Sequence, residues 1–263
     1  MTVRRLGITL ALGVALTAAS CSSDTADQAA SDATSAASSV AGEAGDAVSE
    51  ATDDTTSEPT DAPVQELLLT PEEVPSMPMQ AADPAMLAQA GANMELPEGM
   101  EISFDPPECA DAADTNAALA RDVEDGGLAA LMGGGESAPA MYTVQVLRTS
   151  VPFDEYQSNW GSCENVVFEG QALGMRGTST STDAPEIDGA DEVLARISDT
   201  QVDSVLGEGG QMKSLVYMTE VRGVKVVGGA MTAPGAGGEL GPEAEAALTD
   251  LMTQQVAKIN DAA

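Results

Sequence analysis

The sequence contains no histidine and few aromatic residues, and both shortages exclude classes of chemistry. Without histidine the chain cannot build Ser-His-Asp or Cys-His catalytic groups, and it lacks the commonest protein ligand of zinc and iron. Aromatic residues make up only 3% of the chain. Because sugar-binding clefts usually stack sugars on aromatic rings, an enzyme that processes polysaccharides is disfavoured. We therefore expect no catalytic residue, no metal site and no cofactor.

Basic residues are also scarce, since 10 Lys and Arg stand against 43 Asp and Glu, for a formal net charge of -33. Such a surface repels nucleic acid and anionic lipid head groups, so we expect no nucleic-acid partner. Divalent cations or a basic partner would be attracted instead, although a strongly solvated surface is the simpler interpretation. We expect the few cations to form surface ion pairs.

The start of the chain has the pattern of an export signal. Two arginines precede an apolar run from Leu6 to Ala19, which is too short for a comfortable transmembrane helix, so residues 1–20 are predicted to be a signal peptide. Small residues before Cys21 resemble the lipobox of bacterial lipoproteins. That family prefers leucine three residues before the cysteine, where this chain has Ala18, and Leu16 lies two residues further back.

The lipobox resemblance implies that Cys21 is acylated, with a lipid such as palmitate. Cys21 would then anchor the chain in the cell membrane, facing the extracytoplasmic side or the cell wall. Ordinary secretion with an unpaired cysteine is the alternative, but a free exposed thiol is a liability outside the cell.

Residues 21–63 have the composition of an acidic tether. From residue 22 to residue 63, Ser, Thr, Ala, Asp and Glu dominate, with 10 acids and no base. This composition cannot bury enough apolar surface to offset chain entropy, so we expect a disordered segment that holds a folded domain away from the membrane. Alanines at alternating spacings of three and four leave a weak single helix open as an alternative.

The pattern changes at Val64, and residues 64–263 predict one globular α+β domain with a mainly antiparallel sheet and helices packed on one face. Two strong strands, 215–221 and 224–230, flank Arg222-Gly223, which suits a tight hairpin turn. Pro242 begins a last helix with an apolar stripe. Further expected elements are strands at 102–104, 142–150, 165–168, 176–182 and 192–198, helices after Thr70, at 84–90, at 110–123 and from Pro152 to Trp160, and a loop at 126–139.

Cys109 and Cys163 remain once Cys21 is assigned to lipid. Two cysteines in an exported domain are most simply paired, so we expect a disulfide between them. A redox-active pair is the alternative, but the sequence contains no Cys-x-x-Cys motif.

Several short motifs together resemble the small extracellular sensor domains of actinobacteria. The resembling parts are Leu67-Leu68-Leu69-Thr70, the lone Cys109 before a helix, Trp160-Gly161-Ser162-Cys163, the hairpin from Val216 to Val227, and the terminal helix. Proteins of this kind include the extracellular domain of PknH-type serine/threonine kinases and related mycobacterial lipoproteins. The kinase domain has two disulfides, whereas this chain can form one. The resemblance implies an α+β fold with a cleft for an unknown ligand and no catalysis.

A Met- and Pro-rich arm, residues 76–100, supports two further hypotheses. Thioethers bind Cu(I), so Met77, Met79, Met86 and Met94 could form a copper site, although methionine is also an adaptable apolar filler. The same arm could bind an envelope protein and make the chain an accessory subunit. A third hypothesis is a hydrolase that uses paired carboxylates.

These observations together favour a non-enzymatic lipoprotein. We expect a membrane-anchored, extracytoplasmic chain whose domain is sensor-like or binds a small ligand. Its partners would be the membrane, through the lipid, and a small ligand or an envelope protein.

Overall fold

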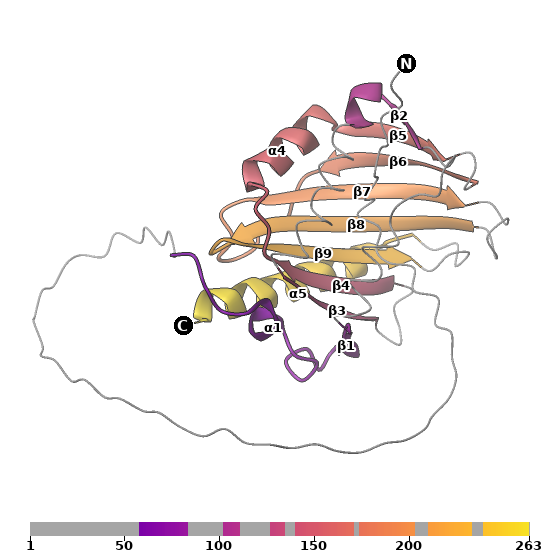
Figure 1. The fold of residues 1–263 in the computed structure, drawn as a ribbon. Helices are drawn as coiled ribbons and strands as arrows, with labels where there is room; N and C mark the ends of the chain where they lie inside the picture. The colour runs from indigo at the N-terminus through magenta and orange to yellow at the C-terminus, as the bar shows by residue number, and fades with distance from the viewer. Residues whose placement is uncertain are drawn as a thin grey trace, which may run out of the picture. The chain divides into compact units, whose positions relative to one another are not determined.

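The computed structural model describes residues 58–83, 102–110, 127–134, 140–170, 174–202, 210–232 and 239–262. These residues form a nine-stranded antiparallel sheet in the order β1-β3-β4-β9-β8-β7-β6-β5-β2 (Figure 1). Its strands are β1 (Met79–Ala81), β2 (Ser103–Asp105), β3 (Leu128–Gly134), β4 (Ala140–Leu147), β5 (Asn165–Gly170), β6 (Met175–Thr182), β7 (Val193–Val202), β8 (Gly210–Val221) and β9 (Val224–Thr232). The described helices are α1 (Val64–Leu67), the 3₁₀ helix η1 (Pro107–Cys109), α4 (Phe153–Ser162) and α5 (Pro242–Asp261). The mainly antiparallel sheet is confirmed.

Several features that the sequence predicts lie in residues that the structure does not describe. The signal peptide, Cys21 and nearly all of the tether lie outside the described residues, as do the helix expected at 84–90 and most of the helix expected at 110–123. No helix among the described residues is both long and apolar enough to cross a membrane.

The predicted hairpin lies at the centre of the sheet, where β8 and β9 pair along most of their length. Arg222 and Gly223 form the turn with φ values of 48° and 76°. A two-residue hairpin turn of type I′ needs positive φ at both positions, which glycine adopts without strain. The Arg222 guanidinium also donates to the carbonyl oxygens of Glu58 and Ile259, both at 3.1 Å. It therefore ties the turn to two distant segments.

Helix α5 covers one face of the sheet, over β4, β9 and β8. Its apolar stripe is buried, as the sequence predicts: Leu248, Leu251, Met252, Val256 and Ile259 are at most 1% exposed. A Cβ atom at Gly228 of β9 would lie 2.5 Å from the Sδ of Met252, so glycine is what permits this close approach. Burying each large apolar side chain contributes about 1.5–3 kcal/mol. The five buried side chains of α5 are therefore a large part of what stabilises the main core.

Helix α4 packs against the opposite face, so the expectation that the helices share one face is wrong. Successive residues of a strand point to opposite faces of a sheet. Tyr217 of β8 belongs to the core beneath α5, whereas the next residue, Met218, packs with Tyr156 and Trp160 of α4. Because both faces of β8 carry large apolar side chains, each face needs a cover.

Strand β3, Leu128–Gly134, occupies half of the segment that we predicted to be a loop, residues 126–139. It pairs with β1 on one side and with β4 on the other. The glycines that indicated a loop are needed for close packing, since a Cβ at Gly133 would lie 2.4 Å from the carbonyl oxygen of Pro78. A glycine inside a strand marks such an approach of another backbone.

The helix predicted after Thr70 is also wrong, because residues 71–73 form turns. The expected capping contact nevertheless exists, with the backbone N–H of Thr70 donating to Oε2 of Glu73 at 2.6 Å. A short helix, α1, lies before this point instead, and its Val64 and Leu67 are buried in the core beneath α5.

Residues 58–63, which we assigned to the tether, lie against the folded domain. The backbone N–H of Thr60 donates to the carbonyl oxygen of Arg222 at 3.0 Å, and Thr60 is only 5% exposed. Arg148 donates to the carbonyl oxygens of Thr60 and Ala62 at 2.8 and 3.0 Å. Packing against the sheet therefore extends a few residues before Val64.

Candidate functional site

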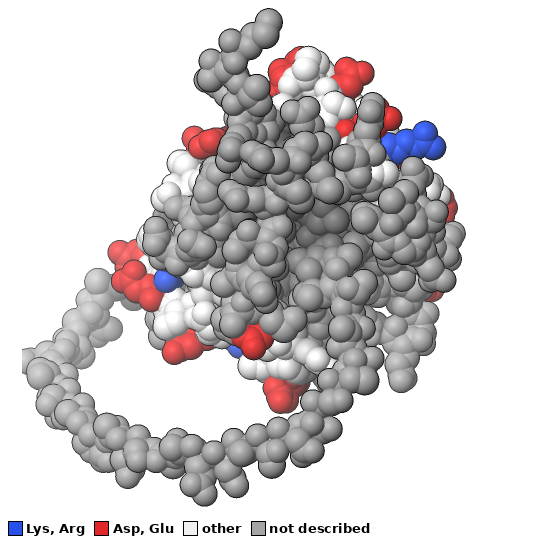
Figure 2. Space-filling view, turned by 45° about the vertical axis from the view of Figure 1, so that its right-hand side comes forward, with Lys and Arg blue, Asp and Glu red and all other residues white. Residues whose placement is uncertain are grey.

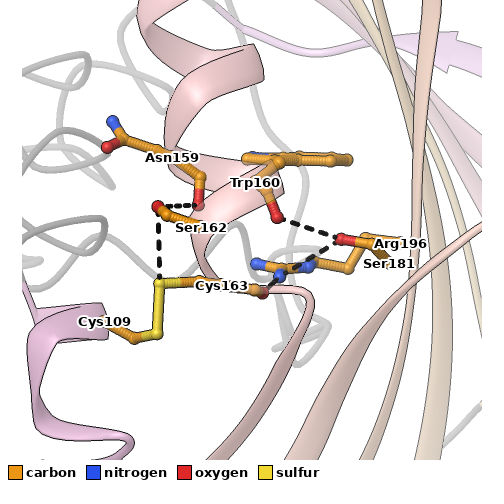
Figure 3. Close-up of a disulfide and its surroundings, with 7 residues drawn as sticks. All are labelled: Cys109, Asn159, Trp160, Ser162, Cys163, Ser181 and Arg196. Atoms are coloured by element: carbon orange, nitrogen blue, oxygen red, sulfur yellow. Dashed lines mark hydrogen bonds between the residues drawn. A yellow bond between two sulfur atoms is a disulfide. The ribbon is translucent and has the colours of Figure 1, made fainter.

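The predicted disulfide between Cys109 and Cys163 is present, with their Cα atoms 5.7 Å apart. It joins η1 to the residue that ends α4 (Figure 3). Both cysteines are 3% exposed and pack with Val166 and Phe104. A buried disulfide in an apolar cluster links chain segments and is poorly accessible to thiols. We therefore assign it a structural role.

Arg196 of β7 holds the end of α4 beside the disulfide. Its Nη2 donates to the carbonyl oxygen of Cys163 and lies 3.4 Å from Oγ of Ser181, and its guanidinium lies 5.3 Å from the ring centre of Trp160 (Figure 3). Burial lowers the pKa of Arg196 from its usual value. The guanidinium contacts both the carbonyl oxygen of Cys163 and the ring of Trp160, so we infer that Arg196 fixes the C-terminal end of α4 against the sheet.

The other cations have varied environments, which corrects the expectation of surface ion pairs. Lys213 pairs with the exposed Glu239 at 2.7 Å, as expected. Lys225, by contrast, is only 3% exposed and pairs with Glu220 at 3.0 Å, while its Nζ lies 5.8 Å from the ring centre of Tyr156. A buried cation needs such partners to offset its lost hydration.

Four methionines from adjacent strands form a row on the face that α4 also packs against. The row consists of Met132 (β3), Met141 (β4), Met231 (β9) and Met212 (β8). Met141 and Met231 are direct partners across β4 and β9. Met132 pairs with Thr143, two residues from Met141, so Met132 and Met141 are diagonal neighbours. Long side chains reach each other at that spacing.

Met212 extends the row onto β8. It lies two residues before Ser214, the partner of Met231, and therefore points to the same face as Met231. Met218 shares that face and packs with α4 at a point further along β8. Met212 and Met231 are 8% and 7% exposed, whereas the two other methionines are half-buried. Small residues flank the row, including Ala130 on β3 and Gly229 on β9.

Flexible, polarisable thioethers adapt to irregular apolar shapes, and protein surfaces that accept varied apolar partners use them. A sheet face that combines methionines with small residues can therefore receive an apolar group. This methionine row is the arrangement in the described structure that fits binding of a ligand best.

The methionine row is not the cluster that the sequence indicated. Met79 is buried beneath α5 at 4% exposure, and Met77 packs against the same core. Met86 and Met94 lie outside the described residues. Met77 and Met79 therefore act as apolar filler. The methionine row could not be predicted from the sequence, because its members are far apart in the chain and only strand register makes them neighbours.

No group of three or more Asp, Glu or Cys side chains within the described ranges is placed to hold a metal ion.

A family model described as a domain of unknown function, DUF5642, matches residues 62–260. No curated protein matches the chain.

A solved structure of an uncharacterised protein from Mycobacterium smegmatis, the Rv0999 ortholog, is similar to the chain. The two are 20% identical with a TM-score of 0.44, and the match covers 76% of this chain and 98% of that one. The family match, which spans almost all described residues, is the relationship by which the chain is classified.

Proposed function

Because the chain belongs to the DUF5642 family, whose function is undefined, we propose a function from its own residues. The chain is a lipid-anchored extracytoplasmic lipoprotein whose domain binds an apolar ligand without catalysis. The observation that carries the binding role is the methionine row, Met132, Met141, Met231 and Met212. The sensor role of the PknH-type domains that the sequence resembles would be one use of such binding.

The anchor and the location have separate support. Cys109 and Cys163 form a buried disulfide, and structural disulfides persist in oxidising compartments outside the cytoplasm. Pairing these two leaves Cys21 for the lipid. The signal-like start and the small residues before Cys21 agree with that assignment.

The chemistry of the ligand follows from the row. Thioethers and the methyl groups of alanine offer dispersion contacts and almost no hydrogen-bonding capacity. Thr143 and Ser214, which are register partners of Met132 and Met231, supply hydroxyl groups on the same face. An acyl chain with a polar end matches this combination better than a sugar or a nucleotide does.

Binding is tested by titrating the exported Cys21→Ser chain with a fluorescent fatty acid. We expect saturable binding that weakens at least about tenfold, or about 1.4 kcal/mol, in Met132→Gln/Met141→Gln. Both methionines are half-buried, so glutamine there spares the fold. The matched control is Met77→Gln, a half-buried methionine beneath α5, which should bind as the parent does. Unsaturable binding, or equal loss in the control, would contradict the proposal.

The anchor is tested by metabolic labelling with a fatty-acid analogue. Label should appear on the parent chain and disappear in Cys21→Ala. Label that persists in this variant would refute the anchor without affecting the binding role of the domain.

A further inference from the structure

Helix α5 leaves half of its own sheet face uncovered. It contacts β9, β4 and β8, whereas β6, β5 and β2 lie beyond it in the sheet (Figure 1). Val167 of β5 and Ile197 of β7 are 51% and 41% exposed, and they are the exposed large apolar side chains of the described structure. These two residues are separated by one strand, β6.

Strand register places Val167 and Ile197 on the same face as α5. Ile197 lies two residues after Ala195, whose partner Tyr217 is buried beneath α5. Ile197 pairs with Thr180 of β6. Two residues before Thr180, Thr178 pairs with Val167. Because residues two apart on a strand share a face, all of these side chains point the same way.

We call Val167, Thr178, Thr180 and Ile197 the open patch. Thr178 is exposed and Thr180 is half-buried, so hydroxyl and methyl groups lie between the two aliphatic side chains. The patch contains no aromatic ring for stacking a sugar. Single exposed aliphatic residues are common on proteins, but two on the same sheet face, with charged residues around them, match the apolar centre and polar rim of a binding surface.

Carboxylates surround the open patch. Asp105 of β2 is the register partner of Val167, and Glu169 lies two residues along β5 from Val167, so both share its face. Asp199 lies two residues after Ile197, and its carboxylate accepts two hydrogen bonds from Gln211, at 2.8 and 2.7 Å. Two cations share the face: Arg176 is the partner of Glu169, and Lys213 is the partner of Asp199 and also pairs with Glu239 at 2.7 Å. With Glu239 included, four carboxylates stand against these two cations, so the rim is acidic.

The negative charge around the open patch indicates which kind of partner could bind there. The whole chain carries a net charge of -33, and Figure 2 shows acidic side chains outnumbering basic ones among its coloured residues. A second copy would bring like charges together, and an anionic lipid surface would be repelled. A cationic partner would be attracted to the same groups.

We propose that the open patch binds a polypeptide segment of another protein that presents aliphatic side chains flanked by lysine or arginine. The aliphatic groups pack on Val167 and Ile197, and the cations lie near Asp105, Glu169 and Asp199. The open patch is on the opposite face of the sheet from the methionine row. Binding of a polypeptide to the open patch can therefore be tested independently of ligand binding at the methionine row.

The probe is the synthetic peptide Lys-Lys-Val-Thr-Val-Thr-Val-Lys-Lys carrying a fluorophore. Its anisotropy is followed as the full chain, kept in non-ionic detergent, is added. Val167→Thr/Ile197→Thr removes the aliphatic groups and keeps β-branched side chains that suit strands. Glu169→Lys/Asp199→Lys reverses the rim charge. The matched control, Asp61→Lys/Glu72→Lys, makes the same charge change at two exposed positions elsewhere.

We expect the parent chain to bind the peptide, with at least about tenfold weaker binding in both patch variants and less than about twofold weakening in the control. Thermal unfolding of all variants checks that each is folded. Absence of binding by the parent overturns the proposal. Equal loss in the control also overturns it, because the attraction would then be unspecific. A dimer that dissociates in the threonine variant would overturn it in favour of a second copy.

Discussion

The sheet face that carries α5 has a covered half and an open half, and the two halves differ in what their strands present. In the covered half, inward positions such as Tyr142, Val144 and Val226 are at most 2% exposed. In the open half, the corresponding positions include the exposed Thr178 and Val167. A helix is about 10 Å across, and neighbouring strands are about 4.8 Å apart. One helix therefore shields two or three strands, and the remaining strands must be polar or be covered by a partner.

The largest effect is expected from removing the disulfide, which supports the open half from the opposite face. The linked cysteines are 54 residues apart. Opening a loop of that length costs about 4 kcal/mol in the chain-entropy description. Cys109→Ser/Cys163→Ser should lose about that much in urea unfolding. Hydrogen exchange should accelerate most in β2 and β5. Equal acceleration in β4 and β9 would show that the halves are one cooperative unit.

The next effect concerns the contact that defines the covered half. Leu251 of α5 is 1% exposed and lies in the main core. Leu251→Ala leaves a cavity and should destabilise the chain by about 3 kcal/mol in the same measurement. Ile197→Ala in the open half is the comparison, and it should cost well under half as much. Similar losses at both positions would mean that the open half is packed in solution.

A third effect concerns a buried polar contact that attaches α5 to the N-terminal segment. Gln255 is 0% exposed, accepts from the N–H of Leu69 at 3.0 Å and donates to the carbonyl oxygen of Leu67 at 2.8 Å. Gln255→Leu leaves both backbone groups without partners and should cost about 2 kcal/mol. Calorimetry gives the change in unfolding temperature. Gln211→Leu, at an exposed position beside the open patch, is the control. An unchanged temperature in Gln255→Leu would refute the contact.

The smallest effect is a pH dependence on the covered half. Lys258 of α5 donates to Glu73 at 2.7 Å and lowers the pKa of that carboxyl, helped by the backbone N–H of Thr70. A lowered carboxyl pKa adds stability above the ordinary value of 4.5, which is lost as the pH falls through the lowered value. Because Glu73 is 45% exposed, we expect less than about 1 kcal/mol. Glu73→Gln should remove this part of the acid dependence seen in unfolding curves. A parent and variant with parallel curves would exclude the contribution.

Local patterns predicted the elements that depend on neighbouring residues. The Arg222-Gly223 turn, the stripe of α5 and the alternation in β4 follow from rules that act over a few positions. The Cys109–Cys163 pair was also predictable, because the hypothesis that Cys21 carries lipid left two cysteines and therefore one pairing. The glycine-rich β3 and the turns after Thr70 escaped, because packing against Pro78 and the core overrides local preference.

The candidate surfaces were much harder to predict than the elements. Met132, Met141, Met231 and Met212 are distributed over a hundred residues of sequence, and only the order of strands makes them neighbours. The open patch has the same origin. Val167 and Ile197 each look like ordinary strand residues, and what exposes them is the width of α5 relative to the sheet. The methionines that the sequence pattern indicated, Met77 and Met79, are close in the chain but are packed in the core beneath α5.

The sequence by itself determined the export-like pattern at its start, the acidic composition of residues 22–63, the exclusion of histidine chemistry, the pairing of Cys109 with Cys163 and the mainly antiparallel sheet. Each of these depends on composition or on short-range pattern. Only the tertiary structure decided that the helices lie on opposite faces, that a methionine row crosses four strands and that half of one face stays open. These features depend on strand order and register, which are set by the summed packing of residues far apart in the chain.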